Sequence, residues 1–288
     1  MSQKRQKKLV NVLQSASCSG NCAPTSCRYD AAKLEGGTFS VFDPVQGPVP
    51  DCHLIAALAS MAWVKEQDLS RSGAAGTYAF KSGNQTITKE ILYNNSTPSG
   101  AQFGPNNAMW PLWYEKAFAK LKGCANWTDP KTNVSCPNVC NIPAGAGMDS
   151  LIEIAVNYPN NNKPGFTIKY QVAGDIAKMK QALDAITNPG AKTTKPAVAW
   201  TGTATNEIVS GHTYSYLGYV DKNPDYYIVL RNPCKVEPQP PNAKLLTAGK
   251  WPSTVNGPID FSKYNPSDGI FALNFKAITN GLTIGYVY

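Results

Sequence analysis

The chain has 288 residues, of which 42% are hydrophobic and only 16% charged, with a formal net charge of +8. This apolar content excludes a disordered chain, and the length allows one large domain, or two small ones, with a sizeable core. The sequence contains only two histidines, so any imidazole chemistry must use His53 or His212, and a site with three histidine ligands is excluded.

The N-terminal part begins with a basic, Cys-rich extension over residues 1–29. Four of its first eight residues are Lys or Arg, a pattern typical of a solvated terminus, and we expect no nucleic-acid partner. Breakers over residues 30–50 predict a loop. Asp51 can cap a helix over about 52–66, which is apolar nearly all round and is therefore expected to be buried. No apolar stretch reaches the ~20 residues of a membrane span.

The middle of the chain alternates predicted loops and helices. Residues 67–104 are expected to be loops with one short apolar stretch. A second helix is predicted over about 107–122, with Pro111 in its first turn, where proline is tolerated. Residues 123–147 are rich in Pro, Asn and Gly and predict a long irregular loop.

The last part changes from helical to strand periodicity. Short helices are predicted over 148–157 and 174–187, and β-branched and aromatic runs then predict strands at 196–202, 211–221, 226–231, 269–275 and 282–288. Helices followed by strands indicate an α+β fold. We expect a helical N-terminal subdomain over 30–165 and a β-rich C-terminal subdomain over 166–288.

The cysteines indicate the redox compartment. Six of the eight lie in two clusters, and five asparagines lie in N-x-S/T sequons. Clustered cysteines, sequons and few charges favour a secreted protein, with a cytoplasmic one as the alternative, although no signal peptide is visible. A zinc site is not expected, because Cys136-x-x-x-Cys140 has no matching partner repeat.

Four residues have the chemistry and order of a thiol hydrolase. Cys52 begins the predicted buried helix, where backbone N–H groups and the helix dipole are expected to lower its pKa. His212 opens one predicted strand and Asn232 ends the next, so antiparallel pairing would let Asn232 fix the imidazole tautomer. Gln46 precedes Cys52 and could join its amide as an oxyanion donor.

The segment Gln46–Ala57 resembles the nucleophile motif of calpain-type cysteine proteases, Q-G-x-x-G-D-C-W-[LF]-[LV]-A-A. Further segments resemble family motifs in the family order: Trp110–Leu121, Gly211–Tyr214, Arg231–Pro233 and Ser267–Phe271. The resemblance covers about residues 40–276. It implies a papain-like fold with the cleft between its two subdomains, and it implies roles for four residues: Cys52 as nucleophile, His212 as general base and then acid, Asn232 as the group that orients the imidazole, and Gln46 as oxyanion donor.

Three positions depart from the family pattern. His53 stands where the family has tryptophan, and because adjacent helical residues point about 100° apart, we expect it to face away from the Cys52 partner. Cys234 replaces the tryptophan that follows the family Asn-Pro pair, and Pro50 replaces a glycine.

The resulting hypothesis is a calpain-like endopeptidase that acts on protein or peptide substrates through an acyl-enzyme. One alternative is a peptide ligase or transpeptidase with the same site, and another is a non-catalytic secreted binding protein on a protease-like fold. The sequence requires no cofactor. The resemblance leaves calcium open, and the sequence places no metal ligands.

Reserving Cys52 for catalysis leaves seven cysteines. Three disulfides and one free thiol are therefore predicted, with Cys234 as the candidate for the free thiol. A second hypothesis is that an N-terminal cysteine bonds Cys52, which would make residues 1–29 an inhibitory segment.

Overall fold

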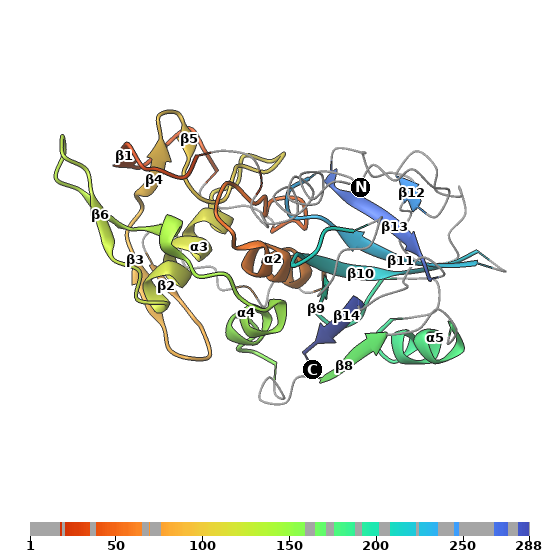
Figure 1. The fold of residues 1–288 in the computed structure, drawn as a ribbon. Coiled ribbons are helices and arrows are strands. Elements are labelled where there is room, and N and C mark those ends of the chain that lie inside the picture. Colours follow the sequence, from red (N-terminus) through yellow and green to blue (C-terminus); the bar gives the residue numbers. More distant parts are fainter. Residues whose placement is uncertain are drawn as a thin grey trace, which may run out of the picture.

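The structure is a computed structural model that describes residues 18, 21–34, 39–64, 69, 76–158, 165–170, 176–187, 192–201, 208–222, 225–235, 245–247, 268–275 and 282–287. Helices and strands are mixed, as predicted for an α+β fold. Figure 1 shows α3 and several short hairpins on one side, a large sheet on the other, and α2 in the middle against the sheet. None of the helices in these ranges combines the length and the apolar character needed to cross a membrane.

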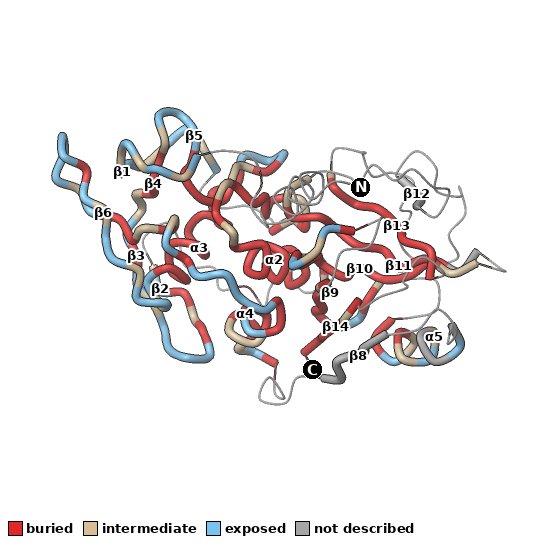
Figure 2. Tube along the Cα trace, in the orientation of Figure 1, coloured by how far each residue is buried: buried red, intermediate tan, exposed pale blue. Residues whose placement is uncertain are grey.

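Three helices build the N-terminal side of the molecule. α2 (Cys52–Val64) and α3 (Trp110–Leu121) confirm the two predicted long helices, and α3 carries its proline in the first turn. α4 (Gly147–Ile154) confirms the shorter helix predicted nearby. Eleven of the 13 residues of α2 are buried, because the sheet, α3 and α4 surround it (Figure 2). This central place explains a helix with no polar face.

The loops predicted in this region contain short strands. Residues 67–104 include β2 (Gly76–Tyr78), β3 (Gln85–Ile87), β4 (Ile91–Asn94) and β5 (Thr97–Pro98). The predicted irregular loop 123–147 holds the hairpin of β6 (Asn126–Thr128) and β7 (Ser135–Pro137), followed by the 3-10 turn η2 (Val139–Asn141). β1 (Ser26–Arg28), in the predicted extension, pairs with β4. The loop predictions were wrong at these strands, which are too short to show a clear alternation of polar and apolar residues.

The C-terminal side is a seven-stranded antiparallel sheet with the order β12-β13-β11-β10-β9-β14-β8. Five of its strands confirm the prediction: β9 (Ala197–Thr201), β10 (Thr213–Lys222), β11 (Asp225–Arg231), β13 (Ile270–Asn274) and β14 (Leu282–Tyr286). The two edge strands, β8 (Gly165–Tyr170) and β12 (Leu245–Thr247), were not predicted.

Alternate residues of the sheet pack on opposite faces, as strand geometry requires. On one face, Val229 of β11 belongs to the apolar cluster that contains Ala59 and Trp63 of α2. Its neighbours Ile228 and Leu230 belong to a second cluster with Leu183 of α5 (Ile176–Asp184). The sheet is therefore apolar on both sides, and its α2 face is the one that meets the helical part.

Six cysteines form three disulfides: Cys18–Cys234, Cys22–Cys140 and Cys27–Cys136. The predicted number of bonds is thus confirmed. The free cysteines are Cys52 and Cys124, so the assignment of Cys234 as the free thiol was wrong. The hypothesis that an N-terminal cysteine bonds Cys52 was also wrong, because all three N-terminal cysteines pair elsewhere.

Candidate active site

Cys52 is the first residue of α2 and its side chain is buried. The backbone carbonyl of Asp51 accepts the first helical bonds, from the amides of Leu54 (2.8 Å) and Ile55 (3.2 Å). Burial raises the pKa of Cys52 to about 11, although the amide and hydroxyl of Thr213 beside the thiol oppose this shift. The expected lowering of this pKa was therefore wrong, because desolvation outweighs the helix terminus. In this conformation the nucleophile candidate is a neutral thiol.

His212 and Asn232 lie at adjoining ends of β10 and β11, which pair in antiparallel register. Nε2 of His212 donates to Oδ1 of Asn232 at 3.0 Å. The same oxygen accepts the Cys234 amide at 3.1 Å. Because a backbone amide can only donate, this second bond identifies the Asn232 atom as oxygen and places the imidazole proton on Nε2.

The other ring nitrogen of His212, Nδ1, is buried and has no hydrogen-bond partner among the described residues. Burial lowers the pKa of His212, and the bond to Asn232 opposes that shift. The imidazole is therefore held neutral, with Nδ1 as a proton acceptor. This is the protonation state that a general base needs.

Two hydrogen bonds fix α2 against β9 and against β10, the strand that His212 directly precedes. The hydroxyl of Ser215 in β10 donates to the carbonyl of Ala56 at 2.8 Å, and Ser60 accepts the Ala197 amide of β9 at 2.7 Å. Thr213, which follows His212, lies beside the Cys52 thiol. The structure thus brings Cys52, His212 and Asn232 into one buried region. Sequence reasoning missed Thr213, although its place next to His212 in the motif was a usable signal.

Gln46 lies on the loop before α2 and is buried. Its side-chain amide donates to the carbonyl of Val49 at 2.7 Å, and its backbone amide donates to the carbonyl of Pro233 at 3.0 Å. Its Oε1 lies 3.6 Å from the sulfur of Cys234. These contacts join Gln46 to the segment that holds Asn232, so all four predicted site residues belong to one assembly.

His53 faces away from this assembly, as the helical geometry predicts. Its Nε2 lies 3.2 Å from the carbonyl of Pro143 and its Nδ1 2.6 Å from the hydroxyl of Ser150. A carbonyl can only accept, so Nε2 carries the proton and Nδ1 accepts from Ser150. Burial lowers the pKa of His53 to about 4. This histidine is a neutral, hydrogen-bonded core residue.

A pair of buried carboxyl groups lies directly behind Cys52. Burial raises the pKa of Asp51 to about 7 and that of its neighbour Glu115 of α3 well above the usual range. Both oxygens of Glu115 are within 2.9 Å of the Ala101 amide. The predicted capping by the Asp51 side chain was wrong, because its carboxyl meets Glu115 and bonds to no helix amide within the described ranges. The sequence signal for this pair was Glu115, an acidic residue among the mostly apolar residues of α3.

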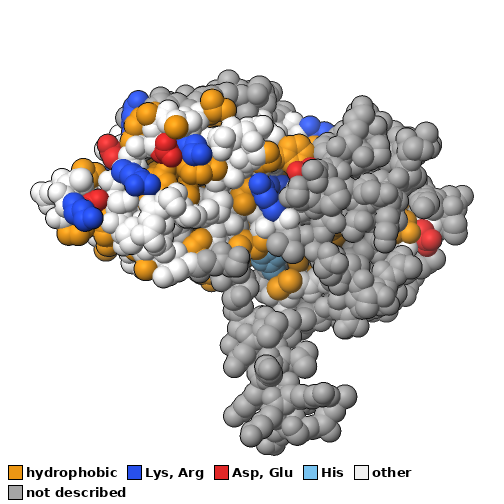
Figure 3. Space-filling view, turned by 90° about the horizontal axis from the view of Figure 1, so that it is seen from above, with side chains coloured by type: hydrophobic (Ala, Val, Ile, Leu, Met, Phe, Trp, Pro, Cys, Tyr) orange, Lys and Arg blue, Asp and Glu red, His pale blue; other side chains and the backbone are white. Residues whose placement is uncertain are grey.

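The described residues contain neither a cluster of metal ligands nor, on the face shown in Figure 3, a continuous basic patch. Within the described residues, no three His, Cys, Asp or Glu side chains converge as a metal site. Figure 3 shows Lys and Arg side chains standing apart from one another on the face it presents. Calcium, which the family resemblance left open, is not tested by these residues, and the lack of a nucleic-acid partner stays a prediction.

A cysteine at a helix start, in one buried region with an imidazole that an amide orients, is typical of cysteine-nucleophile hydrolases. The model of the family described as calpain family cysteine protease matches residues 23–237. The chain therefore belongs to the calpain family of cysteine proteases. It is also 26% identical, over 296 aligned positions, to a thiol protease of Porphyromonas gingivalis. That match covers 88% of this chain and 56% of the relative, so the chain spans little more than half of the relative's length.

Proposed function

We propose that the chain is a cysteine endopeptidase with a papain-like fold, which hydrolyses protein or peptide substrates through a thioester acyl-enzyme. The observation that carries the proposal is the hydrogen bond of 3.0 Å from His212 Nε2 to Asn232 Oδ1. This bond leaves Nδ1 as the proton acceptor in the region where Cys52 begins α2. Family membership supports the same roles for these residues.

In the first half of the reaction, Nδ1 of His212 takes the proton of the Cys52 thiol as the sulfur attacks the substrate carbonyl carbon. The carbonyl oxygen becomes an oxyanion, and we assign its stabilisation to the Cys52 amide and the side-chain amide of Gln46. When the C–N bond breaks, the imidazolium returns its proton to the leaving amine. The products of this half are a thioester on Cys52, a free amine and a neutral imidazole.

In the second half, Nδ1 accepts a proton from water, and the resulting hydroxide attacks the thioester carbonyl. The C–S bond then breaks and the proton passes to the sulfur, which regenerates the thiol and releases a carboxylic acid. Asn232 holds the ring in one orientation throughout, because its Oδ1 also accepts the Cys234 amide. Burial raises the pKa of the Cys52 thiol, so its proton must pass to Nδ1 of His212 before or during the attack.

The three disulfides support an oxidising, extracellular compartment for this enzyme, because such bonds are rare in reducing cytosol.

Hydrolysis of unstructured protein substrates by purified protein tests the proposal. Cys52→Ala and His212→Ala are each expected to lower kcat/KM by about a thousandfold or more, because nucleophile and base act together. Cys124→Ala removes the other free thiol and is expected to leave hydrolysis unchanged. Equal activity of wild type and Cys52→Ala would contradict the proposal.

A further inference from the structure

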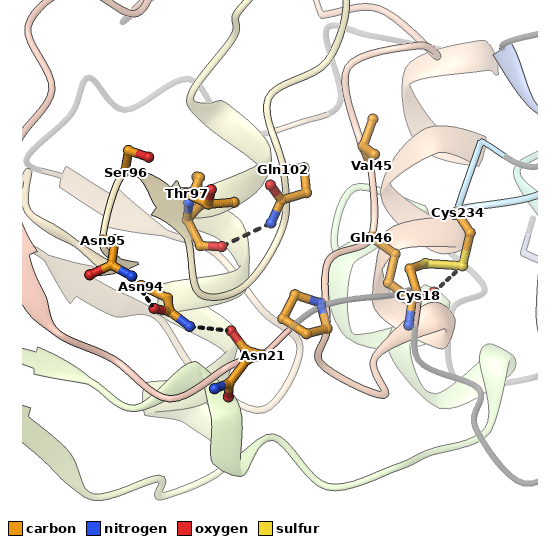
Figure 4. A pocket seen from close by; sticks show the side chains of 12 residues that line it. Cys18, Asn21, Val45, Gln46, Asn94, Asn95, Ser96, Thr97, Gln102 and Cys234 are labelled. Atoms are coloured by element: carbon orange, nitrogen blue, oxygen red, sulfur yellow. Dashed lines mark hydrogen bonds between the residues drawn. A yellow bond between two sulfur atoms is a disulfide. The ribbon is translucent and has the colours of Figure 1, made fainter.

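A polar cavity of about 510 Å³ opens beside the proposed site. Its walls come from the loop that carries Gln46, from the β4–β5 hairpin, and from the N-terminal segment at Cys18 and Asn21 (Figure 4). The volume falls within the range of ~300–1,000 Å³ typical of ligand sites. We propose that this cavity is a substrate subsite for an uncharged polar side chain of the Asn, Gln, Ser or Thr kind. The inference rests on the proposed protease function and deepens it.

The cavity lies next to the residues that would handle the scissile bond. Gln46 and Cys234 both line it, and Oε1 of Gln46 is 3.6 Å from the sulfur of Cys234. The amide of Cys234 in turn bonds Oδ1 of Asn232, which holds His212. Cys52 itself does not line the cavity, so we assign the cavity to a substrate residue near the scissile bond, on the side of Gln46 and Cys234.

The chemistry of the walls selects an uncharged group. The polar side chains that face the cavity are amides and hydroxyls, and none of the described residues lining it is charged. The side-chain NH2 group of Gln102 donates its hydrogens to the carbonyls of Pro98 (2.8 Å) and Gly100 (2.9 Å). The polar atom of this side chain that takes no part in these two bonds is Oε1, which is a hydrogen-bond acceptor. A charged substrate side chain would lose hydration and find no opposite charge among these residues.

The walls are held in place before a substrate arrives. Asn94 donates to the carbonyl of Asn21 at 2.8 Å, which joins the hairpin to the N-terminal segment. The disulfide Cys18–Cys234 ties that segment to the loop after Asn232. The backbone amide of Gln102 donates to the carbonyl of Val45 at 2.7 Å, which joins this wall to the loop that carries Gln46. A preformed pocket of this kind discriminates between side chains, because its walls do not have to become ordered when the substrate binds.

Placing a charge in the wall tests the inference. Thr97 lines the cavity from β5 and is exposed. Wild type, Thr97→Asp and Thr97→Lys would each digest a mixed peptide library, with the cleavage sites read by mass spectrometry. Thr86→Asp, which places the same charge at an exposed position of β3, outside the residues that line the cavity, is the matched control. Binding of the same peptides to Cys52→Ala variants gives a readout that does not depend on turnover.

We expect wild type and Thr86→Asp to prefer Asn, Gln, Ser or Thr at one substrate position. At that position, Thr97→Asp should raise cleavage and binding of Lys and Arg peptides about threefold to fivefold, and Thr97→Lys should do the same for Asp and Glu peptides. Identical preferences in all four proteins, with cleavage intact, would overturn the subsite and leave the protease function standing. Absence of cleavage by wild type, with Cys52 unreactive, would overturn both.

Discussion

The buried carboxyl pair behind Cys52 makes the stability of the protein depend on pH in a defined direction. Asp51 and Glu115 have raised pKa values in the folded chain, so the folded state holds protons that the unfolded chain releases above about pH 4. The free energy of unfolding therefore falls as the pH rises above the ordinary carboxyl pKa. Each proton that the folded state retains lowers the free energy of unfolding by about 1.4 kcal/mol per pH unit, which is on the order of 2–3 kcal/mol between pH 5 and pH 7.

Glu115→Gln is the informative perturbation. Its amide oxygen can still accept the Ala101 amide, and its NH2 group can donate to Asp51, so the packing is kept while the titrating proton is removed. We expect the loss of stability between pH 5 and pH 7 to shrink, by on the order of 2–3 kcal/mol relative to wild type, and the double variant with Asp51→Asn to shrink it further.

Urea unfolding at pH 5, 6 and 7 measures this difference. The buried histidines contribute the opposite sign, because their lowered pKa values remove stability as the pH falls below about 6.5. They do so in every variant, so only the difference from wild type is interpreted. Glu153→Gln, at a partly exposed carboxylate on α4, is the control. The reasoning is refuted if wild type and the double variant lose stability equally over this range.

Three further outcomes are expected. His53→Gln should keep wild-type kcat/KM while lowering the urea midpoint, because His53 bonds Ser150 and Pro143 in the core; a large loss of kcat would speak against its structural role. Iodoacetamide added to denatured, unreduced protein should label Cys52 and Cys124 only, and a third label would disprove the disulfide pattern. Gln46→Ala should lower kcat by about a hundredfold with a modest change in KM, and an unchanged kcat would exclude it as an oxyanion donor.

Local sequence signals predicted much of the site. The apolar run after Asp51 predicted α2, and strand periodicity around His212 and Asn232 predicted two neighbouring antiparallel strands. Both signals act within a few residues, so no knowledge of packing was needed. The rotation between adjacent helical residues likewise separated Cys52 from His53.

Features that depend on distant partners were not predictable in this way. Asp51 was expected to cap α2, but α3 brings Glu115 against it, and only the packed fold reveals that pair. The pKa of Cys52 was expected to be lowered, but it is raised, because β10 and its neighbours bury the thiol. The pairing of Cys18 with Cys234 joins segments 216 residues apart, and cysteine counting cannot identify such a partner.

Covalent labelling of Cys52 tests the central claim most directly. Native, unreduced protein would be treated with an epoxide thiol inhibitor, with and without calcium, and mapped by mass spectrometry beside His212→Ala and Cys124→Ala. We predict rapid labelling of Cys52 in wild type and in Cys124→Ala, and strongly reduced labelling in His212→Ala, because the neutral thiol needs His212 to accept its proton. An absence of label at Cys52 in wild type at every calcium concentration, or equal labelling in His212→Ala, would contradict the account.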